Sequence, residues 1–132
     1  MASRGSRSDS QHRAFAAANA ALDKQAEDVL VLDLRKLSTM ADFFVLATAA
    51  SRPQVLAITE HIERTFKRAG DRAGHIEGRV TRESARQAAS GEPLSWVLMD
   101  CGDVVVHVFD PAARGFYQLE RLWGDAPRHT VS

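Results

Sequence analysis

The stretch from Ser95 to Asp110, SWVLMDCGDVVVHVFD, is almost continuously hydrophobic, yet it carries a thiol, an imidazole and three carboxylates. Three kinds of chemistry are open to these groups. Cys101 is a candidate nucleophile, and His107 is a candidate general base that a carboxylate could orient. Asp100 and Asp103 are, with His107, candidate metal ligands. The backbone decides among these hypotheses, because it determines which side chains meet.

Gly102 and Asp103 predict the geometry of this segment, since glycine at the first position of a two-residue hairpin loop is typical of a type II′ turn. Counting outward pairs Cys101 with Val104 and Trp96 with Phe109. Alternation along each strand then gives two different faces. The aliphatic face carries Val97, Met99, Cys101, Val104, Val106 and Val108, and the mixed face carries Trp96, Leu98, Asp100, Val105, His107 and Phe109.

This pairing separates the thiol from the imidazole. Cys101 is predicted to be structural, because a thiol on an aliphatic face behaves as a small hydrophobe. Asp100 and His107 are diagonal neighbours, about 7–8 Å apart between backbones, so a carboxylate–imidazole hydrogen bond is possible. A metal site is disfavoured, since Asp103 lies at the turn tip and no second histidine is close in sequence. We therefore predict no catalytic residue, metal or cofactor, and interpret the mixed face as structural or as an interface.

Composition narrows the class of protein. A chain of 132 residues, 26% charged and 45% hydrophobic, is typical of one soluble globular domain. The 17 basic and 17 acidic side chains cancel, so neither a dedicated nucleic-acid site nor an anionic membrane surface is predicted. The single cysteine fits a reducing compartment, which favours the cytoplasm. No apolar run approaches the roughly 18 residues of a membrane span.

The elements before the hairpin follow from periodicity and propensity. Residues 1–13 are rich in Ser and Arg and are expected to be a disordered tail, with an organellar transit peptide as the alternative. The alanine-rich segment 14–24 predicts a helix, and the runs 29–34 and 42–49 predict buried strands. An amphipathic helix is predicted over 51–70, where Ser51 and Gln54 form a capping box.

The remaining elements surround the hairpin. A short strand is predicted at His75–Glu77, and residues 79–93 are expected to be an exposed insertion loop. Asp110 can cap a final helix that begins at Pro111, and residues 127–132 are expected to be a tail. The order predicts a single α/β (α+β mixed) domain, residues 14–126, with a central mixed five-stranded sheet flanked by helices.

Three segments of the chain carry a specific resemblance. The pattern W-x-x-x-D-x-G-D-V-V-V-H-V-F from Trp96 to Phe109, and F-Y-x-L-E-R-L-W from Phe116 to Trp123, resemble the signature of the ribosomal silencing factor S family, the Iojap-related proteins. Upstream, TMADFFVLATAASRPQVLAITEHIE resembles the second strand and following helix of that family. The resemblance extends over roughly Ala14 to Ala126, the size of one domain.

The resemblance implies a fold similar to a degenerate nucleotidyltransferase, without enzymatic activity. It also implies binding to the large ribosomal subunit through its fourteenth ribosomal protein, a block of association with the small subunit, and repression of translation in starvation or stationary phase. A homodimer is expected. The family's contact positions correspond to Trp96, Asp100, Tyr117, Glu120, Arg121 and Trp123, with Gly102, Asp103 and His107 in the shared hairpin motif.

The residues alone leave alternatives open. Tyr117 is as consistent with a half-buried core tyrosine as with a contact, and Trp123 shares a predicted apolar stripe with Phe116 and Leu119. A nucleotidyltransferase-fold enzyme or nucleotide-binding protein is the alternative function. It would need a glycine-rich helix start and paired strand carboxylates, which the chain lacks. An RNA-binding module would need a basic stripe with interleaved aromatics, and the basic and acidic side chains here are evenly mixed.

Overall fold

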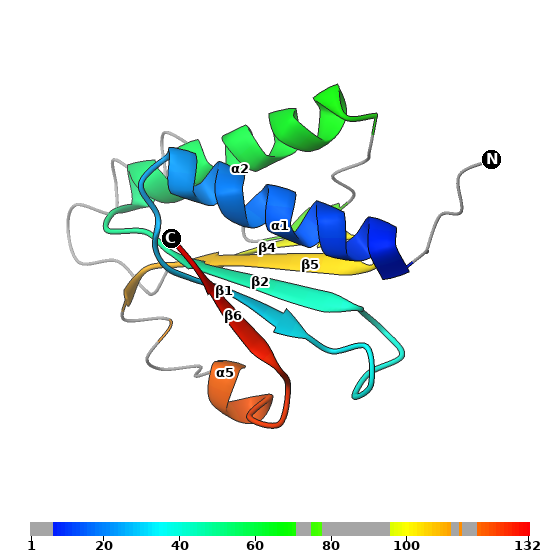
Figure 1. Cartoon of the computed structure of the whole chain (residues 1–132). Helices are drawn as coiled ribbons and strands as arrows, with labels where there is room; N and C mark the ends of the chain where they lie inside the picture. The colour runs from blue at the N-terminus through cyan, green and yellow to red at the C-terminus, as the bar shows by residue number, and fades with distance from the viewer. Residues whose placement is uncertain (1–6, 71–74, 78–95, 112–113, 115–118) are drawn as a thin grey trace.

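The computed structural model describes residues 7–70, 75–77, 96–111, 114 and 119–132. A six-stranded sheet has helices α1 and α2 packed together over one face, while α5 lies on the other side (Figure 1). In chain order the elements are α1 (Arg7–Asp23), β1 (Glu27–Asp33), β2 (Phe43–Thr48), α2 (Arg52–Arg68), β3 (His75–Glu77), β4 (Trp96–Cys101), β5 (Val104–Phe109), α5 (Leu119–Leu122) and β6 (Arg128–Val131).

The strands lie in the order β3-β4-β5-β2-β1-β6. Neighbouring strands are antiparallel except for β2 and β5, which run parallel in the middle of the sheet. The predicted mixed sheet in a single α/β domain is therefore confirmed, and all five predicted strands are present. The predicted insertion loop, 79–93, lies outside the described residues.

The expected C-terminal tail, 127–132, is corrected by the sixth strand. Residues of β6 pair with β1 antiparallel, from Arg128 opposite Leu32 to Val131 opposite Val29. Val131 packs against the core, and the ring of His129 meets that of Phe15 edge to face at 5.8 Å. A polar edge strand of this kind has no run of apolar residues, so periodicity alone could not reveal it.

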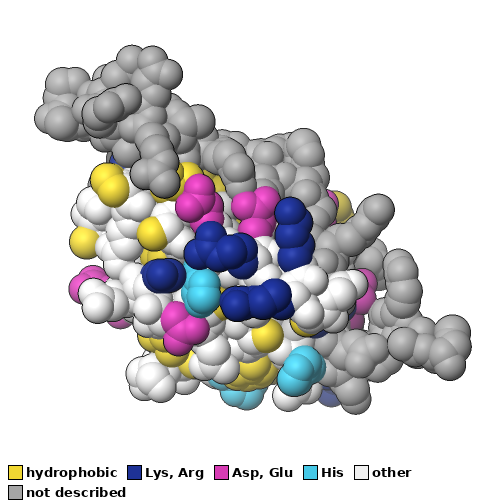
Figure 2. Space-filling view, turned by 90° about the horizontal axis from the view of Figure 1, so that it is seen from above, with side chains coloured by type: hydrophobic (Ala, Val, Ile, Leu, Met, Phe, Trp, Pro, Cys, Tyr) yellow, Lys and Arg dark blue, Asp and Glu magenta, His cyan; other side chains and the backbone are white. Residues whose placement is uncertain are grey.

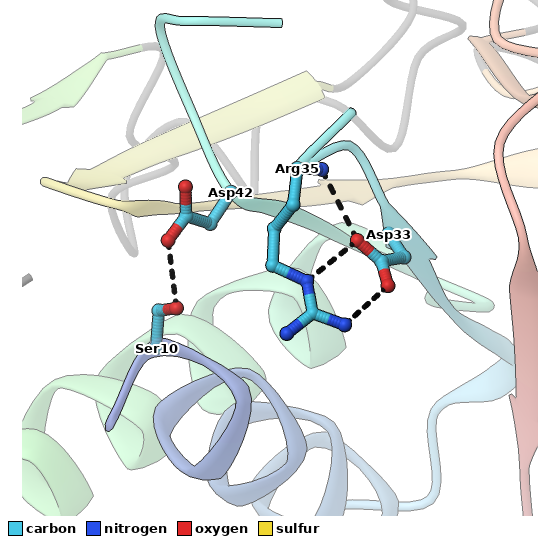
Figure 3. A network of polar contacts seen from close by, with 4 residues as sticks. All are labelled: Ser10, Asp33, Arg35 and Asp42. Atoms are coloured by element: carbon cyan, nitrogen blue, oxygen red, sulfur yellow. Dashed lines mark hydrogen bonds and ion pairs between the residues drawn. The ribbon is translucent and has the colours of Figure 1, made fainter. Parts of the chain in front are cut away.

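The expected N-terminal tail is also too long, because α1 begins at Arg7. Ser10 is buried, and its hydroxyl donates a 2.8 Å hydrogen bond to the carboxylate of Asp42 (Figure 3). Arg13 donates to the carbonyl of Cys101 at 2.8 Å. These contacts hold the first turns of α1 against the end of the sheet, which local composition does not show. Residues 1–6 lie outside the described chain.

A second polar contact closes the same end of the sheet. The Arg35 guanidinium donates two hydrogen bonds to the Asp33 carboxylate, from Nε to Oδ1 at 2.9 Å and from Nη2 to Oδ2 at 2.6 Å (Figure 3). These hydrogen bonds hold the pKa of the Asp33 carboxyl below its usual range. The guanidinium also lies 4.9 Å from the centre of the Phe43 ring. Arg35 therefore ties the end of β1 to the start of β2.

The capping box predicted for α2 is confirmed in one half and altered in the other. The Gln54 backbone donates to the Ser51 hydroxyl at 3.2 Å, but the Gln54 side-chain carbonyl accepts from Ala50 rather than from Ser51. The Gln54 amide nitrogen donates to the carbonyls of Lys24 and Gln25, each at 3.0 Å. One side chain therefore joins the start of α2 to the end of α1.

The core has a layer on each side of the sheet. Between the sheet and the helices, alanines of α1 pack with the buried apolar face of α2, which includes Val55, Ile58, Ile62 and Phe66. Outside this layer the helix surface is mixed in charge: Figure 2 shows Lys and Arg side chains near its middle with Asp and Glu beside them. The second layer carries Leu32, Leu34, Leu46, Phe109, Leu119 and Ala126, with Leu30, Phe44, Trp96 and Trp123 partly buried against it.

Candidate functional site

The hairpin β4–β5 has the predicted register throughout, from Trp96 opposite Phe109 to Cys101 opposite Val104. Gly102 has φ +82 and Asp103 is not among the residues with positive φ, as a type II′ turn requires. The predicted aliphatic face is buried under the helices. Cys101 therefore lies in the core, where its thiol contacts the Met99 carbonyl at 3.8 Å. This placement supports a structural role for the thiol.

The mixed face of the hairpin differs from the prediction in its central hydrogen bond. His107 accepts at Nδ1 from the indole N–H of Trp96, at 3.0 Å, so the suggested Asp100–His107 bond is wrong. Asp100 is exposed, and its Oδ1 accepts from the backbone N–H of Gly102 at 3.1 Å. Trp96 and Asp100 are both diagonal neighbours of His107, but a neutral indole costs less free energy to bury than a charged carboxylate. The carboxylate stays at the turn, where water reaches it.

His107 is 3% exposed and lies among aromatic rings. Its ring centre is 4.6 Å from that of Phe44, 5.7 Å from that of Trp96 and 6.1 Å from that of Phe109. Burial lowers the pKa of the imidazole to about 4, so it is neutral near pH 7. Because Nδ1 accepts from Trp96, the proton belongs on Nε2, which is buried and has no hydrogen-bond partner among the described residues. A neutral imidazole so enclosed supports the aromatic face and is not placed to take a proton from a substrate.

Helix α5 lies over the same side of the sheet. Leu119 is buried there, and the Trp123 ring packs edge to face on Phe44 at 5.9 Å. Arg121 is exposed, and Leu122 is 73% exposed. One side of this short helix is thus docked, while its other side presents a cation and a large apolar side chain to solvent. A single exposed leucine is ordinary, but here it lies next to the half-buried Trp123, and a continuous apolar patch is what indicates an interface.

The structure brings some of the predicted contact residues together and separates others. Trp96 and Trp123 belong to one apolar cluster. Asp100 lies at the opposite end of β4 from Trp96, about 13 Å along the strand. Tyr117 lies outside the described residues. The candidate site is therefore centred on Trp96 and the helix α5.

The hairpin tip has its own contacts. Asp103 lies 3.9 Å from Arg13 between charged atoms, and its carbonyl accepts from the backbone N–H groups of Asp42 and Phe43. These bonds attach the tip to α1 and to the start of β2. The shared motif residues Gly102 and Asp103 thus have a structural explanation that needs no partner.

The sequence prediction missed Arg114. Its side chain is 11% exposed and donates to Glu120, to Thr48 and to the carbonyl of Asp28. Opposite charges four residues apart on a helix would have signalled a pair, but Arg114 and Glu120 are separated by six. The other two partners come from β1 and β2, which no local pattern links to this arginine.

No three His, Cys, Asp or Glu side chains of the described residues are grouped closely enough to hold a metal ion. None of the helices in the described ranges has the length and hydrophobicity required to cross a membrane.

Comparison with known proteins adds to this geometry. A family model described as "Ribosomal silencing factor during starvation" matches residues 7–132. A protein of Bacillus subtilis named "Ribosomal silencing factor RsfS" is 43% identical over 111 residues, which cover 84% of each chain. The relative of the same name in Halalkalibacterium halodurans is 42% identical over 84% of this chain and 85% of its own. "Protein Iojap, chloroplastic" of Arabidopsis thaliana is 39% identical over 89% of this chain and 45% of its own.

Two solved structures share the fold. A crystal structure of a Chromobacterium violaceum protein superposes with a TM-score of 0.72 at 36% identity, covering 87% of this chain and 86% of that one. A crystal structure from Bacillus halodurans gives a TM-score of 0.70 at 36% identity, covering 92% and 99%.

Proposed function

The chain belongs to the ribosomal silencing factor (RsfS) family, and from this membership we propose that it binds the large ribosomal subunit and represses translation. In this proposal it binds through the fourteenth large-subunit ribosomal protein and prevents the small subunit from joining. The effect would operate during starvation or stationary phase, when fewer active ribosomes are needed. The family is named for silencing and not for catalysis, which fits a protein that acts by occupying a surface.

The observation that carries the proposal is the exposure of α5. Leu122 is 73% exposed beside the exposed Arg121 and the half-buried Trp123, on a helix that Leu119 anchors to the sheet. Tryptophan and arginine side chains on a fixed support are typical of interface hot spots. We propose that the contact surface comprises Trp96, Asp100, Tyr117, Glu120, Arg121 and Trp123, and that the exposed Leu122 belongs to it as well.

Cosedimentation with separated ribosomal subunits tests this proposal. The protein should pellet with large subunits and not with small subunits, and it should inhibit their association in a joining assay. Leu122→Ala should weaken binding about tenfold, because a buried leucine contributes roughly 1.5–3 kcal/mol at an interface. Met40→Ala is the matched control, since Met40 is 88% exposed in the loop between β1 and β2.

Tyr117→Ala provides a second test of the same surface. A folded variant should lose large-subunit binding, because truncation of a hot-spot aromatic costs about 2 kcal/mol or more. Circular dichroism reports whether the variant is folded. Normal binding by both Tyr117→Ala and Leu122→Ala would remove both residues, and with Leu122 the helix α5, from the contact surface.

We further propose that the free protein is a homodimer in the cytoplasm. The partly buried aromatics Phe44, Trp96 and Trp123 on one side of the sheet offer apolar area for a second copy. Light scattering across micromolar concentrations should give twice the monomer mass. A monomer mass throughout that range would exclude the dimer without affecting ribosome binding.

A further inference from the structure

Arg114 joins three segments that are distant in the sequence. Its Nη1 donates to the Thr48 hydroxyl at 2.6 Å and to the Asp28 carbonyl at 2.5 Å, while its Nε donates to Glu120 Oε2 at 3.1 Å. The guanidinium lies 6.0 Å from the centre of the Phe109 ring. One side chain therefore attaches α5 to β1, to the end of β2 and to the end of β5.

The acceptor on β1 depends on an unusual backbone conformation. Asp28 has φ +50, and the pairing of β1 with β2 shifts register between Glu27 and Leu30. A shift of this kind releases a carbonyl from the regular ladder and turns it away from the neighbouring strand. Positive φ in a non-glycine residue is costly and persists only where surrounding contacts compensate for it. The hydrogen bond to Arg114 is such a contact.

Glu120 is held from two directions. Arg114 binds its Oε2, and Arg128 Nη2 donates to its backbone carbonyl at 3.0 Å. Its other carboxylate oxygen, Oε1, is buried and has no hydrogen-bond partner within the described part of the chain. Because Oε1 is enclosed, a donor from a partner cannot reach it in this arrangement, and the Glu120 carboxylate acts through Arg114 on the position of α5.

We propose that Arg114 is a positioning residue for the partner-binding surface: it locks Glu120 and α5 on the sheet, and so fixes how the exposed Arg121 and Leu122 face the partner. This inference rests on the proposed ribosome binding and adds to it the residue that orients the contact.

The first test is a double-mutant cycle on large-subunit binding. Arg114→Met and Glu120→Gln should each weaken binding about tenfold, as expected for the loss of one hydrogen bond to a charged group. The double variant should be weaker than either single variant by no more than about twofold, because both changes remove the same contact. Arg35→Met is the matched control, since it removes another arginine–carboxylate pair outside α5. Equal binding by wild type and Arg114→Met, or full additivity in the cycle, would overturn the proposal.

The second test reports on α5 without the ribosome. The chain has two tryptophans, so a Trp96→Phe background leaves Trp123 as the only reporter. Adding Arg114→Met should shift Trp123 emission to the red and increase its quenching by acrylamide, whereas Arg35→Met should change neither. Arg114→Lys should recover part of the binding, because an ammonium can pair with Glu120 but cannot form the same fork.

If Arg114→Met does not fold, Thr48→Val removes one anchor at nearly constant volume. That variant should show the red shift of Trp123 emission and weakened binding. If neither changes, Arg114 does not position α5. If wild type does not bind large subunits, the proposed function fails. The fluorescence result then still decides whether Arg114 positions α5.

Discussion

The stability of this protein should depend on pH through one buried imidazole. His107 has its pKa lowered to about 4 by burial, from 6.5 for an accessible histidine. In the unfolded chain the ring takes up a proton near pH 6.5, whereas in the folded chain it stays neutral until about pH 4. Its contribution to stability is therefore fully present above pH 6.5 and is lost as the pH falls toward 4.

The size of the loss follows from the two pKa values. Between pH 7.5 and pH 5.5 the free energy of unfolding should fall by about 1.4 kcal/mol, and by pH 4.5 the loss should reach about 2.5 kcal/mol. Below the folded pKa the loss reaches its limit, since both states then carry the proton. The lowered pKa of Asp33 acts in the same direction, but its window lies below its usual value of 3.8. The two effects therefore separate along the pH axis.

Urea unfolding at pH 7.5, 5.5 and 4.5 measures this dependence. His107→Asn is the informative variant, because the asparagine oxygen can accept from Trp96 in place of Nδ1 but does not titrate. It should be less stable than wild type at pH 7.5, since it loses the ring contacts with Phe44 and Phe109. Between pH 7.5 and pH 5.5 its free energy of unfolding should fall by about 1.4 kcal/mol less than that of wild type. Identical pH slopes for the two proteins would refute the assignment of this titration to His107.

Four further changes test the sequence-derived structure. Cys101→Ser should lower the free energy of unfolding by about 1–3 kcal/mol, because it buries a hydroxyl, and should leave large-subunit binding nearly normal in cosedimentation. Ser51→Ala removes the cap of α2 and should cost about 1 kcal/mol in urea unfolding. Gly102→Ala should cost about 1 kcal/mol or more through its positive φ alone, since no neighbouring atom lies within 4 Å of the added methyl; loss well beyond this would point to a clash. A short Gly/Ser linker in place of residues 79–93 should leave the Tm almost unchanged, and insoluble protein would show that this segment packs.

Local rules were sufficient where a short stretch determines its own geometry. The turn at Gly102 and Asp103 predicts every pair of the β4–β5 register, because a two-residue loop leaves one alignment. The buried face of α2 follows from the spacing of its apolar residues in the same way. These features need no knowledge of the rest of the chain.

Local rules failed where a polar residue finds its partner far away in the sequence. The first turns of α1 depend on Ser10 meeting Asp42, and β6 depends on β1 lying beside it. At the candidate site, the strand register allows His107 a hydrogen bond with either Trp96 or Asp100. The bond forms with Trp96, because burying the charged carboxylate would cost more free energy than burying the neutral indole. Arg114 was missed for the same reason, because its acceptors on β1 and β2 become neighbours only in the folded sheet.

The parallel pair at the centre of the sheet affects how the chain reaches this fold. β1–β2 and β4–β5 each join strands that are close in sequence, so either can form early from local contacts. The bond between them, β2 to β5, joins Phe43 to Val104, roughly 60 residues apart, and must close a long loop first. During synthesis the middle of the sheet cannot close until β5 has left the ribosome, so β2 must wait with one edge unpaired. Helix α1, which precedes both strands in the chain and contacts β1 and β2, is in position to cover one face of this hairpin before β5 is made.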